Sequence, residues 1–298
     1  MKTKKYKVGL ALGGGAARGW AHFGIIRALN EHGIKPDVVC GTSMGALVGA
    51  AYVTQCHSRF EEWVLSLRKR DIAGLLDFTI NGGGLIEGDR VMKFLRRHIV
   101  ENIKIENLNL SYAAVATELT TGNEVWFQQG ELLDAVRASI SLPGLFTPVY
   151  LNGRWFADGA LVNPVPVSVC RALGAERVIA IDLNGHLYGK MFNTKKQPNA
   201  VVKTKSMAVN GMMRWVNGTL VNNKDHAVPG VIDVLSRSVY IMQDRITRSR
   251  MAGNPPDVLL RPDLSSIGLL DFERAAESID KGFEVVERHL PALDELYH

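Results

Sequence analysis

Short apolar runs alternate with helical patterns in the first third of the chain. Residues Lys7–Leu12 have the pattern of a buried strand, and a helix is expected over Arg18–His32, ending at Gly33. A second strand, Asp37–Cys40, leads into a helix that begins near Met44. Strand, helix and strand in this order form a β-α-β unit with parallel strands. The pattern therefore predicts an α/β fold built on a parallel sheet.

Farther along, alternating apolar and polar residues predict two antiparallel hairpins. The first turns at Thr121-Gly122-Asn123, and the second at Asn152-Gly153, a pair that strongly favours a tight turn. Their strands are expected at Tyr112–Leu119 with Glu124–Phe127, and at Val149–Leu151 with Arg154–Phe156. A further core strand and a closing helix are expected at Arg177–Leu183 and Phe272–Leu290.

The segment from Asn184 to Lys224 differs in composition from the rest of the chain. It contains seven basic residues and no acidic one, interleaved with Phe192, Trp215 and several methionines. Such interleaving is typical of membrane-surface segments, but charge runs also form plain solvated loops. We interpret the segment as an insert, either a surface excursion, which is slightly favoured, or a membrane-facing lid.

Composition places the chain among ordinary globular proteins, with one large domain or two small ones. Apolar residues make up 46% of its 298 residues and charged residues 22%, which excludes disordered and fibrous classes. The three cysteines, Cys40, Cys56 and Cys170, form no CxxC pair, so neither a disulfide framework nor a zinc site is expected.

Targeting signals are weak. Lys2, Lys4 and Lys5 are typical of the start of a signal peptide, but the apolar run Val8–Leu12 is too short for one. No run of about 18 apolar residues could span a bilayer. We expect a cytoplasmic protein, either soluble or peripheral at the inner face of the membrane. The formal charge of +5 weakly favours anionic partners.

A G-x-S-x-G sequence, Gly41-Thr42-Ser43-Met44-Gly45, lies between the second predicted strand and the following helix. A nucleophile elbow requires a strand before the serine and a helix after it. It also requires the flanking glycines, because the serine backbone is strained and the strand and helix approach too closely for side chains. The helix N-terminus would also favour negative charge developing at Ser43. A plain glycine-serine turn is the alternative, and the flanking elements make it the less favoured one.

A second glycine-rich turn, Gly13-Gly14-Gly15-Ala16-Ala17-Arg18-Gly19, also follows a strand and opens a helix. Its backbone N–H groups can converge on an anionic oxygen, either an oxyanion or a phosphate. Dinucleotide-binding loops use similar glycines, but Arg18 occupies the place of their sixth-position glycine, and the next strand ends at Cys40 instead of an acidic residue. Nucleotide binding is therefore a disfavoured interpretation of this turn.

A serine nucleophile needs a base, and none of the histidines after Ser43 stands in a compelling position. His186 closely follows the strand at 177–183, although a polar residue opening the insert is its favoured interpretation. Asp158 directly follows the second hairpin, in the sequence Asp158-Gly159-Ala160. On its own, such a sequence is more commonly a turn. Asp158 is a candidate base because this sequence follows the glycine-rich turn and the G-x-S-x-G sequence in order along the chain.

The ordered set GGGAARG, GTSMG and DGA resembles the patatin-like phospholipase family over roughly residues 8–168. The stretch from Ala138 to Pro148 also resembles a family block that packs near the site. The resemblance implies a three-layer α/β/α fold with a mainly parallel central sheet and a helical C-terminal extension. We expect a hydrolase core at 8–168, with residues 169–298 adding a strand, the insert at 184–224 and C-terminal helices to the same unit.

Carried over to this chain, the resemblance implies a Ser-Asp dyad with Ser43 as nucleophile and Asp158 as its partner. Arg18 would brace the glycine loop or help hold an anionic headgroup. The expected oxyanion hole and elbow glycines are Gly14, Gly15 and Ala16, and Gly41 and Gly45. Family members often have glycine where this chain has Ala16, so the hole is expected to be intact if Ala16 has negative φ and activity to be low if φ is positive.

These motifs predict a serine-dependent hydrolase of fatty-acyl esters, such as phospholipids or lysophospholipids, acting through an acyl-serine intermediate. No metal or organic cofactor and no nucleic acid partner is expected. Peripheral contact with an anionic membrane would involve the insert at 184–224. The alternative is a catalytically weak regulatory or adaptor protein that keeps the fold.

Overall fold

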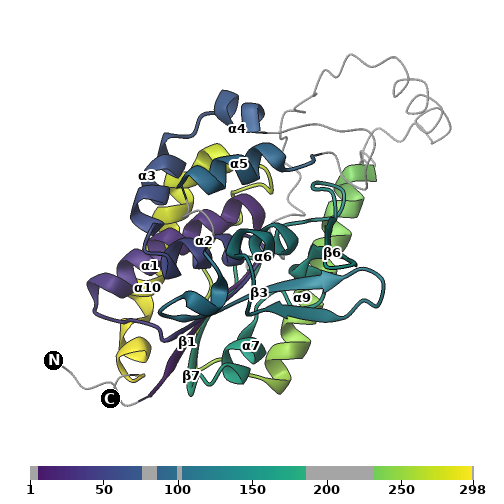
Figure 1. Ribbon diagram of the computed structural model, residues 1–298. Coiled ribbons are helices and arrows are strands. Elements are labelled where there is room, and N and C mark those ends of the chain that lie inside the picture. Colours follow the sequence, from purple (N-terminus) through teal and green to yellow (C-terminus); the bar gives the residue numbers. More distant parts are fainter. Residues whose placement is uncertain (1–5, 76–85, 99–102, 186–230, 297–298) are drawn as a thin grey trace, which may run out of the picture.

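The computed structural model describes residues 6–75, 86–98, 103–185 and 231–296, which surround one central sheet (Figure 1). Eight strands form this sheet in the described residues, in the order β5-β6-β3-β2-β1-β7-β8, with β4 paired to β3. They are β1 (Val8–Leu12), β2 (Val38–Thr42), β3 (Ser111–Glu118), β4 (Glu124–Phe127), β5 (Val149–Leu151), β6 (Arg154–Asp158), β7 (Arg177–Ile181) and β8 (Val258–Leu260).

The five strands β3, β2, β1, β7 and β8 are parallel to one another, whereas β4 and β6 pair antiparallel with β3, and β5 pairs antiparallel with β6. Both predicted hairpins are present at the β3 side of the sheet. Parallel strands place their carboxyl ends at one edge, where α/β proteins gather their functional groups. The glycine-rich turn after β1 and the Gly41–Gly45 turn after β2 both lie at this edge.

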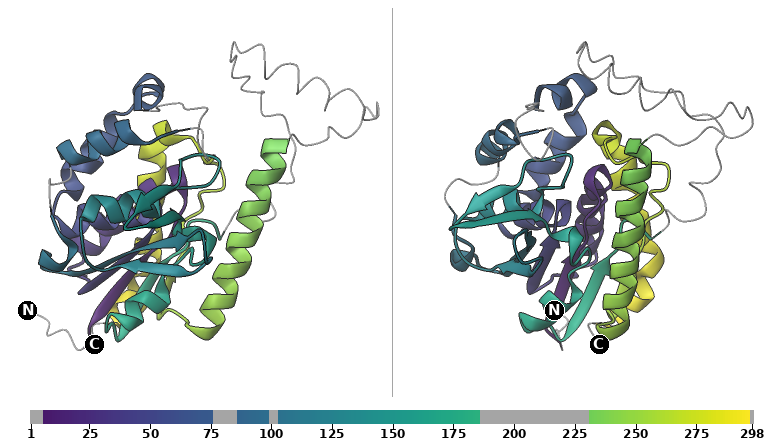
Figure 2. Two further views of the ribbon diagram at one scale, coloured as in Figure 1. Left: turned by 45° about the vertical axis from the view of Figure 1, so that its right-hand side comes forward. Right: turned by 90° about the vertical axis from the view of Figure 1, so that its right-hand side faces the viewer.

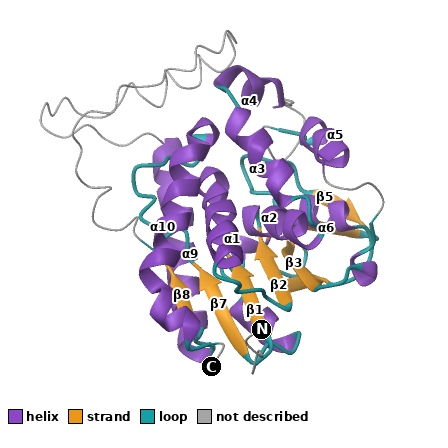
Figure 3. Ribbon diagram, turned by 90° about the vertical axis from the view of Figure 1, so that its left-hand side faces the viewer, coloured by secondary structure: helices purple, strands orange, loops and turns teal. Residues whose placement is uncertain are grey.

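Helices cover both faces of the sheet, which confirms the predicted three-layer fold (Figure 3). Side chains of α1 (Ala21–Glu31), α2 (Met44–Val53) and α10 (Ala275–Asp294) belong to the core on one face. On the other face, α7 (Val167–Ala172) and Met251 of α9 (Val231–Gly253) pack against the sheet. Figure 2 shows α9 as a long helix on the outside of the molecule.

The other helices in the described residues are shorter. The α-helices are α3 (His57–Ser66), α4 (Lys69–Leu75), α5 (Asp89–His98) and α6 (Leu132–Ser139). The 3-10 turns are η1 (Ala16–Trp20), η2 (Ile105–Asn107), η3 (Gly159–Leu161) and η4 (Phe272–Arg274).

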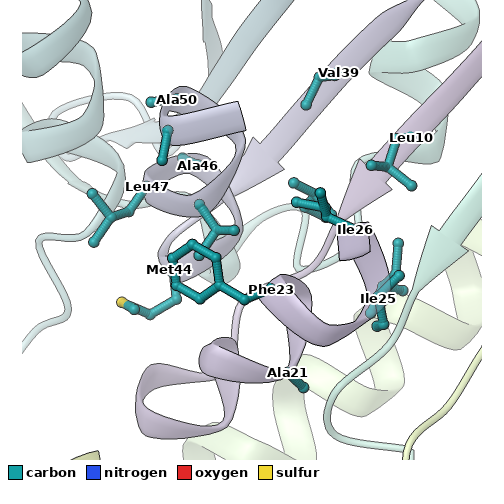
Figure 4. Packing of buried hydrophobic residues seen from close by; sticks show 14 of the residues in the cluster. Leu10, Ala21, Phe23, Ile25, Ile26, Val39, Met44, Ala46, Leu47 and Ala50 are labelled. Carbon is teal, nitrogen blue, oxygen red and sulfur yellow. The ribbon is translucent and has the colours of Figure 1, made fainter. Parts of the chain in front are cut away.

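The larger core forms where the first strands meet α1 and α2. Leu10 and Val39 from the strands, Ile26 from α1 and Leu47 from α2 are all buried in one cluster (Figure 4). Burial of such side chains stabilises the fold by about 1.5–3 kcal/mol each. This packing fixes the ends of β1 and β2, from which both glycine-containing turns extend.

Helices α1 and α10 cross with almost no side chain between them. A Cβ atom on Gly24 of α1 would lie 1.9 Å from the Ile279 carbonyl oxygen, and one on Gly282 of α10 would lie 2.0 Å from the Ala21 oxygen. Two backbones can approach this closely only where both helices have glycine. The C-terminal helix is therefore fixed directly against the helix that follows the glycine-rich turn.

Candidate active site

Ser43 occupies the sharp turn between β2 and α2, with φ 56° and ψ −125°. A non-glycine residue in this region is strained by about 1–3 kcal/mol, a feature that clusters at functional sites. The flanking glycines allow the turn: a Cβ on Gly41 would lie 2.4 Å from the Ala46 nitrogen, and one on Gly45 would lie 2.1 Å from the Leu12 oxygen. Strand and helix thus approach closely enough to present the serine side chain at the apex.

Two hydrogen bonds hold the elbow from neighbouring elements. The Ser43 N–H donates to Ser139 Oγ at 2.8 Å, and this hydroxyl donates in turn to the Val115 carbonyl at 2.6 Å. The Thr42 hydroxyl donates to the Asn163 carbonyl oxygen at 2.8 Å. Sequence reasoning assigned no role to Asn163 and noted Ser139 only as part of a block near the site.

Asp158 lies at the end of β6 and faces Ser43. The Ser43 hydroxyl donates to Asp158 Oδ2 at 2.6 Å, while the Ala160 N–H donates to Oδ1 at 2.8 Å. Only 1% of Asp158 is exposed, and burial raises the pKa of its carboxyl to about 7, against the opposing effect of the two hydrogen bonds. A carboxyl with a pKa near neutrality can both accept and return a proton.

Histidines in the described residues take no part in this pair. His22 is fully buried and makes its hydrogen bond to the Gly13 carbonyl oxygen through Nε2, at 2.8 Å. Burial lowers the pKa of His22 to about 4, so the ring is neutral and supports the glycine-rich loop. His186, the histidine weighed as an alternative base, lies outside the described residues.

The backbone amides of the glycine-rich loop divide into two groups. Gly13 donates to the Ile181 carbonyl at 3.1 Å, and Gly14 donates to the Pro164 carbonyl at 3.0 Å. The N–H groups of Gly15 and Ala16 have no partner in the described part of the chain. The expectation that Gly14 contributes a donor to the oxyanion hole therefore needs correction, because its N–H already has an acceptor.

Gly14 and Ala16 have other effects on the loop. A Cβ on Gly14 would lie 3.2 Å from Ser43 Cβ, so this glycine lets the loop lie close to the elbow. Ala16 adopts φ 47°, the left-handed region in which alanine is strained by about 1–2 kcal/mol. The negative φ that would favour an intact hole is thus not the one found, although the Ala16 N–H is present and unpartnered in the described residues.

Arg18 is buried on the side of the loop that faces α9. Its Nη2 donates a hydrogen bond to the Tyr240 hydroxyl, and its guanidinium carbon lies 4.7 Å from the centre of the Tyr240 ring. Nε and Nη1 have no hydrogen-bond partner in the described part of the chain. Burial lowers the pKa of Arg18, and Tyr240 and Asp271 oppose this effect. The Arg18 N–H also donates to the Gly15 oxygen at 3.1 Å, which closes the turn.

An apolar pocket extends from Ser43 away from the sheet. Its walls come from the loop after β1, from α2 and α3, from α4 and α5, and from the segment after α6. The lining residues include Ala16, Met44, Phe60, Trp63, Ile72, Val91, Phe94, Leu95, Leu142 and Phe146. Among the described residues that line it, Ser43 contributes a hydroxyl and none contributes a carboxylate, an amide side chain or a cationic group. Such a surface suits an alkyl chain whose reacting end reaches Ser43.

The described residues contain neither a metal-binding cluster nor a membrane-spanning helix. No group of three or more His, Cys, Asp or Glu side chains gathers there in a way that could hold a metal ion. None of the helices there combines the length and apolar character needed to cross a bilayer.

Sequence comparison finds a matching family profile and relatives that cover nearly the whole chain. The family profile described as Patatin-like phospholipase matches residues 10–171. An uncharacterized NTE family protein of Mycobacterium tuberculosis is 31% identical over 97% of this chain and 92% of its own length. Patatin-like phospholipase domain-containing protein 6 of Mus musculus is 28% identical over 93% of this chain but only 20% of its own length.

A structural comparison finds a distant likeness to VipD from Legionella pneumophila. The TM-score is 0.43 with 14% sequence identity, covering 99% of this chain and 67% of that one.

Proposed function

Because the chain belongs to the patatin-like phospholipase family, we propose that it is a serine-dependent hydrolase of fatty-acyl esters, acting on phospholipids or lysophospholipids. The family supports lipid hydrolase activity in general. The hydrogen bond of 2.6 Å between the Ser43 hydroxyl and Asp158, at the end of an apolar pocket, is the observation that carries the finer proposal. Ser43 is the nucleophile and Asp158 is its base.

Acylation begins when Ser43 Oγ attacks the ester carbonyl carbon and its proton passes to Asp158 Oδ2. The carbonyl oxygen becomes an oxyanion, which the N–H groups of Gly15 and Ala16, unpartnered within the described residues, would stabilise. The tetrahedral intermediate collapses as the bond to the leaving alcohol breaks, and Asp158 gives that alcohol its proton. The product is an acyl-serine at Ser43.

Deacylation repeats these steps with water. Asp158 accepts a proton from water while the water oxygen attacks the acyl carbon, and the proton then returns to Ser43 Oγ as the fatty acid leaves. The raised pKa of Asp158, about 7, suits this exchange, because a general base acts best when its pKa is close to the working pH. The second carboxylate oxygen accepts from Ala160, which fixes the orientation of the base.

One observation favours the alternative of a catalytically weak regulatory or adaptor protein. Ala16 has positive φ where glycine would be unstrained, and its N–H is one of two proposed oxyanion donors. Strain at that position would weaken the hole without changing the fold. The two functions differ in whether Ser43 reacts.

The test is labelling of the folded protein with a fluorophosphonate, which phosphonylates activated serines, followed by mapping of the modified residue. We expect modification at Ser43 in the wild type, none in Ser43→Ala, and strongly reduced labelling in Asp158→Asn. Ser249→Ala, which changes an exposed serine of α9, is the matched control and should label normally. A folded wild type that is not labelled would favour the adaptor.

We propose a cytoplasmic location with peripheral contact at an anionic membrane as part of the same function. The basic insert at 184–224, the segment first expected to make this contact, lies mostly outside the described residues. The membrane role of that segment stays a prediction, to be tested by vesicle co-sedimentation of a variant with Lys195, Lys196, Lys203 and Lys205 changed to Gln.

A further inference from the structure

Helix α5 has two chemically distinct faces. Val91, Phe94 and Leu95 point into the apolar pocket that leads to Ser43, and Phe94 stacks on Trp63 of α3 with ring centres 3.8 Å apart. The cationic residues of the same helix are exposed: Arg90, Lys93, Arg96 and Arg97. One short helix therefore forms both a wall of the pocket and a basic outer surface.

Helix α4 repeats this arrangement beside α5. Ile72 lines the same pocket, and Arg90 Nη1 of α5 donates to the Gly74 carbonyl oxygen of α4 at 3.2 Å. Figure 3 shows the two helices together at the end of the molecule above the carboxyl edge of the sheet. Three more exposed cations lie at the start of α4: Arg68, Lys69 and Arg70.

Most of this positive charge is not neutralised within the described residues. Lys69 forms an ion pair with Glu273 at 3.2 Å, and Arg70 lies 3.6 Å from Asp71. The three outward cations of α5, Lys93, Arg96 and Arg97, form no ion pair in the part of the chain that the structure describes. Residues 68–75 and 86–97 contain seven cations and three acids, and all ten side chains are exposed.

We propose that this basic face, defined by Arg68, Lys69, Arg70, Lys93, Arg96 and Arg97, binds the anionic headgroups of a lipid bilayer. The inference rests on the proposed lipid hydrolase function and identifies the surface through which the enzyme meets its substrate. Cations attract anionic headgroups, and amphipathic basic helices lie in the headgroup region. Because the cations and the pocket lining share α4 and α5, binding there brings the pocket next to the lipid.

Vesicle co-sedimentation tests the surface independently of catalysis. In a Ser43→Ala background, which cannot form an acyl-serine, we expect binding to vesicles containing phosphatidylglycerol, weaker binding to pure phosphatidylcholine, and release as salt rises. Changing Lys93, Arg96 and Arg97 to Gln should weaken binding to anionic vesicles roughly tenfold or more. The matched control changes three exposed cations elsewhere, Lys35, Lys104 and Arg288, to Gln and should bind like its parent.

Equal binding of the two triple variants, or equal binding to both kinds of vesicle, would overturn the proposal. Activity of the otherwise wild-type enzyme gives a second measurement that separates the two ideas. The α5 triple variant should lose hydrolysis of vesicle phospholipid while hydrolysing a soluble short-chain ester at the wild-type rate. Loss of both activities with normal circular dichroism would contradict the surface role. Absence of any turnover in the wild type, with selective vesicle binding intact, would instead contradict only the proposed hydrolase.

Discussion

Arg18 of the glycine-rich turn is hydrogen-bonded to Tyr240 of α9, 222 positions later in the chain. This is the only hydrogen bond that the Arg18 guanidinium makes within the described residues, and the side chain is 1% exposed. Helix α9 thereby contacts the loop whose amides we assign to the oxyanion hole. The shape of that loop is thus expected to depend on a residue far from the reacting atoms.

Tyr240→Phe removes the hydroxyl and leaves a buried cation without this acceptor. Loss of such a partner costs about 1–3 kcal/mol, so we expect a lower free energy of unfolding, together with a lower kcat and little change in KM. Urea unfolding and steady-state hydrolysis of a short-chain ester measure both effects. Tyr150→Phe, at a tyrosine that is 58% exposed, is the control. If the two variants behave alike, Tyr240 does not position the loop.

The pH dependence of wild-type activity should report Asp158. Only the ionised carboxylate can accept the Ser43 proton, and the pKa of this carboxyl is raised by burial to about 7. We therefore expect kcat/KM to rise with pH below about 7 and to level off above it. Measurement needs an uncharged ester and a check that the protein stays folded at each pH. A profile that is flat from pH 5 to pH 8 would exclude Asp158 as the base with this pKa.

Asp158→Asn should make the protein inactive and, at pH 8, more stable. The unfolded chain ionises this carboxyl near its ordinary pKa of 3.8, whereas the folded chain keeps the proton up to about 7. Between these values the folded state binds more protons, so the free energy of unfolding of the wild type falls as pH rises. The asparagine variant has no ionisable group here, so it does not lose this free energy of unfolding, which is on the order of 4 kcal/mol.

Thermal unfolding at two pH values checks this expectation. The variant should have the higher Tm at pH 8, and the difference should shrink toward pH 4, where the wild-type carboxyl is protonated in the folded state. The pKa shift of His22 is common to both proteins and cancels in the comparison. A variant that is less stable than the wild type at pH 8 would contradict the burial cost assigned to Asp158.

Gly24→Ala should destabilise the fold strongly. The added methyl group would lie 1.9 Å from the Ile279 carbonyl oxygen, so α1 and α10 would have to separate. Overpacking of this kind typically costs about 1–3 kcal/mol, and the contact here is with backbone, which cannot rotate away. The control is Gly253→Ala at the end of α9, where no atom lies within 4 Å of the added Cβ. Equal Tm values for both variants would show that the helices adjust freely.

Elements with a clear periodicity of apolar residues, or with a specific turn sequence, could be predicted from the sequence. The first two strands, both hairpins and α2 were expected close to their observed positions, because buried strands, glycine turns and the elbow leave strong patterns. The helix expected over residues 18–32 in fact begins at Ala21, since Ala16–Trp20 forms a tighter 3-10 turn. Local sequence does not distinguish these two geometries.

The bounds of helix α9 were not predicted, although C-terminal helices were expected, and strand β8 was not predicted. The exposed residues of α9 mix Ile241 and Met242 with arginines, so no apolar stripe marks its buried face. Strand β8 has three residues, Val258–Leu260, and is recognised only through its pairing with β7. Both elements are stabilised by tertiary contacts that a linear pattern does not contain.

In the candidate site, too, some residues are signalled by local motifs and others are recognised only through tertiary contacts. The motifs pointed to Ser43 and Asp158, whose side chains the structure brings into hydrogen-bonding contact. The expectation for Gly14 failed because its acceptor, the Pro164 oxygen, comes from a distant segment. Ser139 and Asn163 support the elbow through contacts with residues far away in the chain. No local spacing signals such partners.

Part of the pocket wall comes from helices that carry neither Ser43 nor Asp158. Ile72, Val91 and Phe94 contribute apolar surface from α4 and α5, whereas Ser43 and Asp158 are fixed at the ends of strands. Under the proposed function, substitutions in these helices would therefore alter which acyl chains fit while the geometry of proton transfer stays the same. Substrate range and chemical rate become separable traits, open to independent divergence among relatives and to independent engineering.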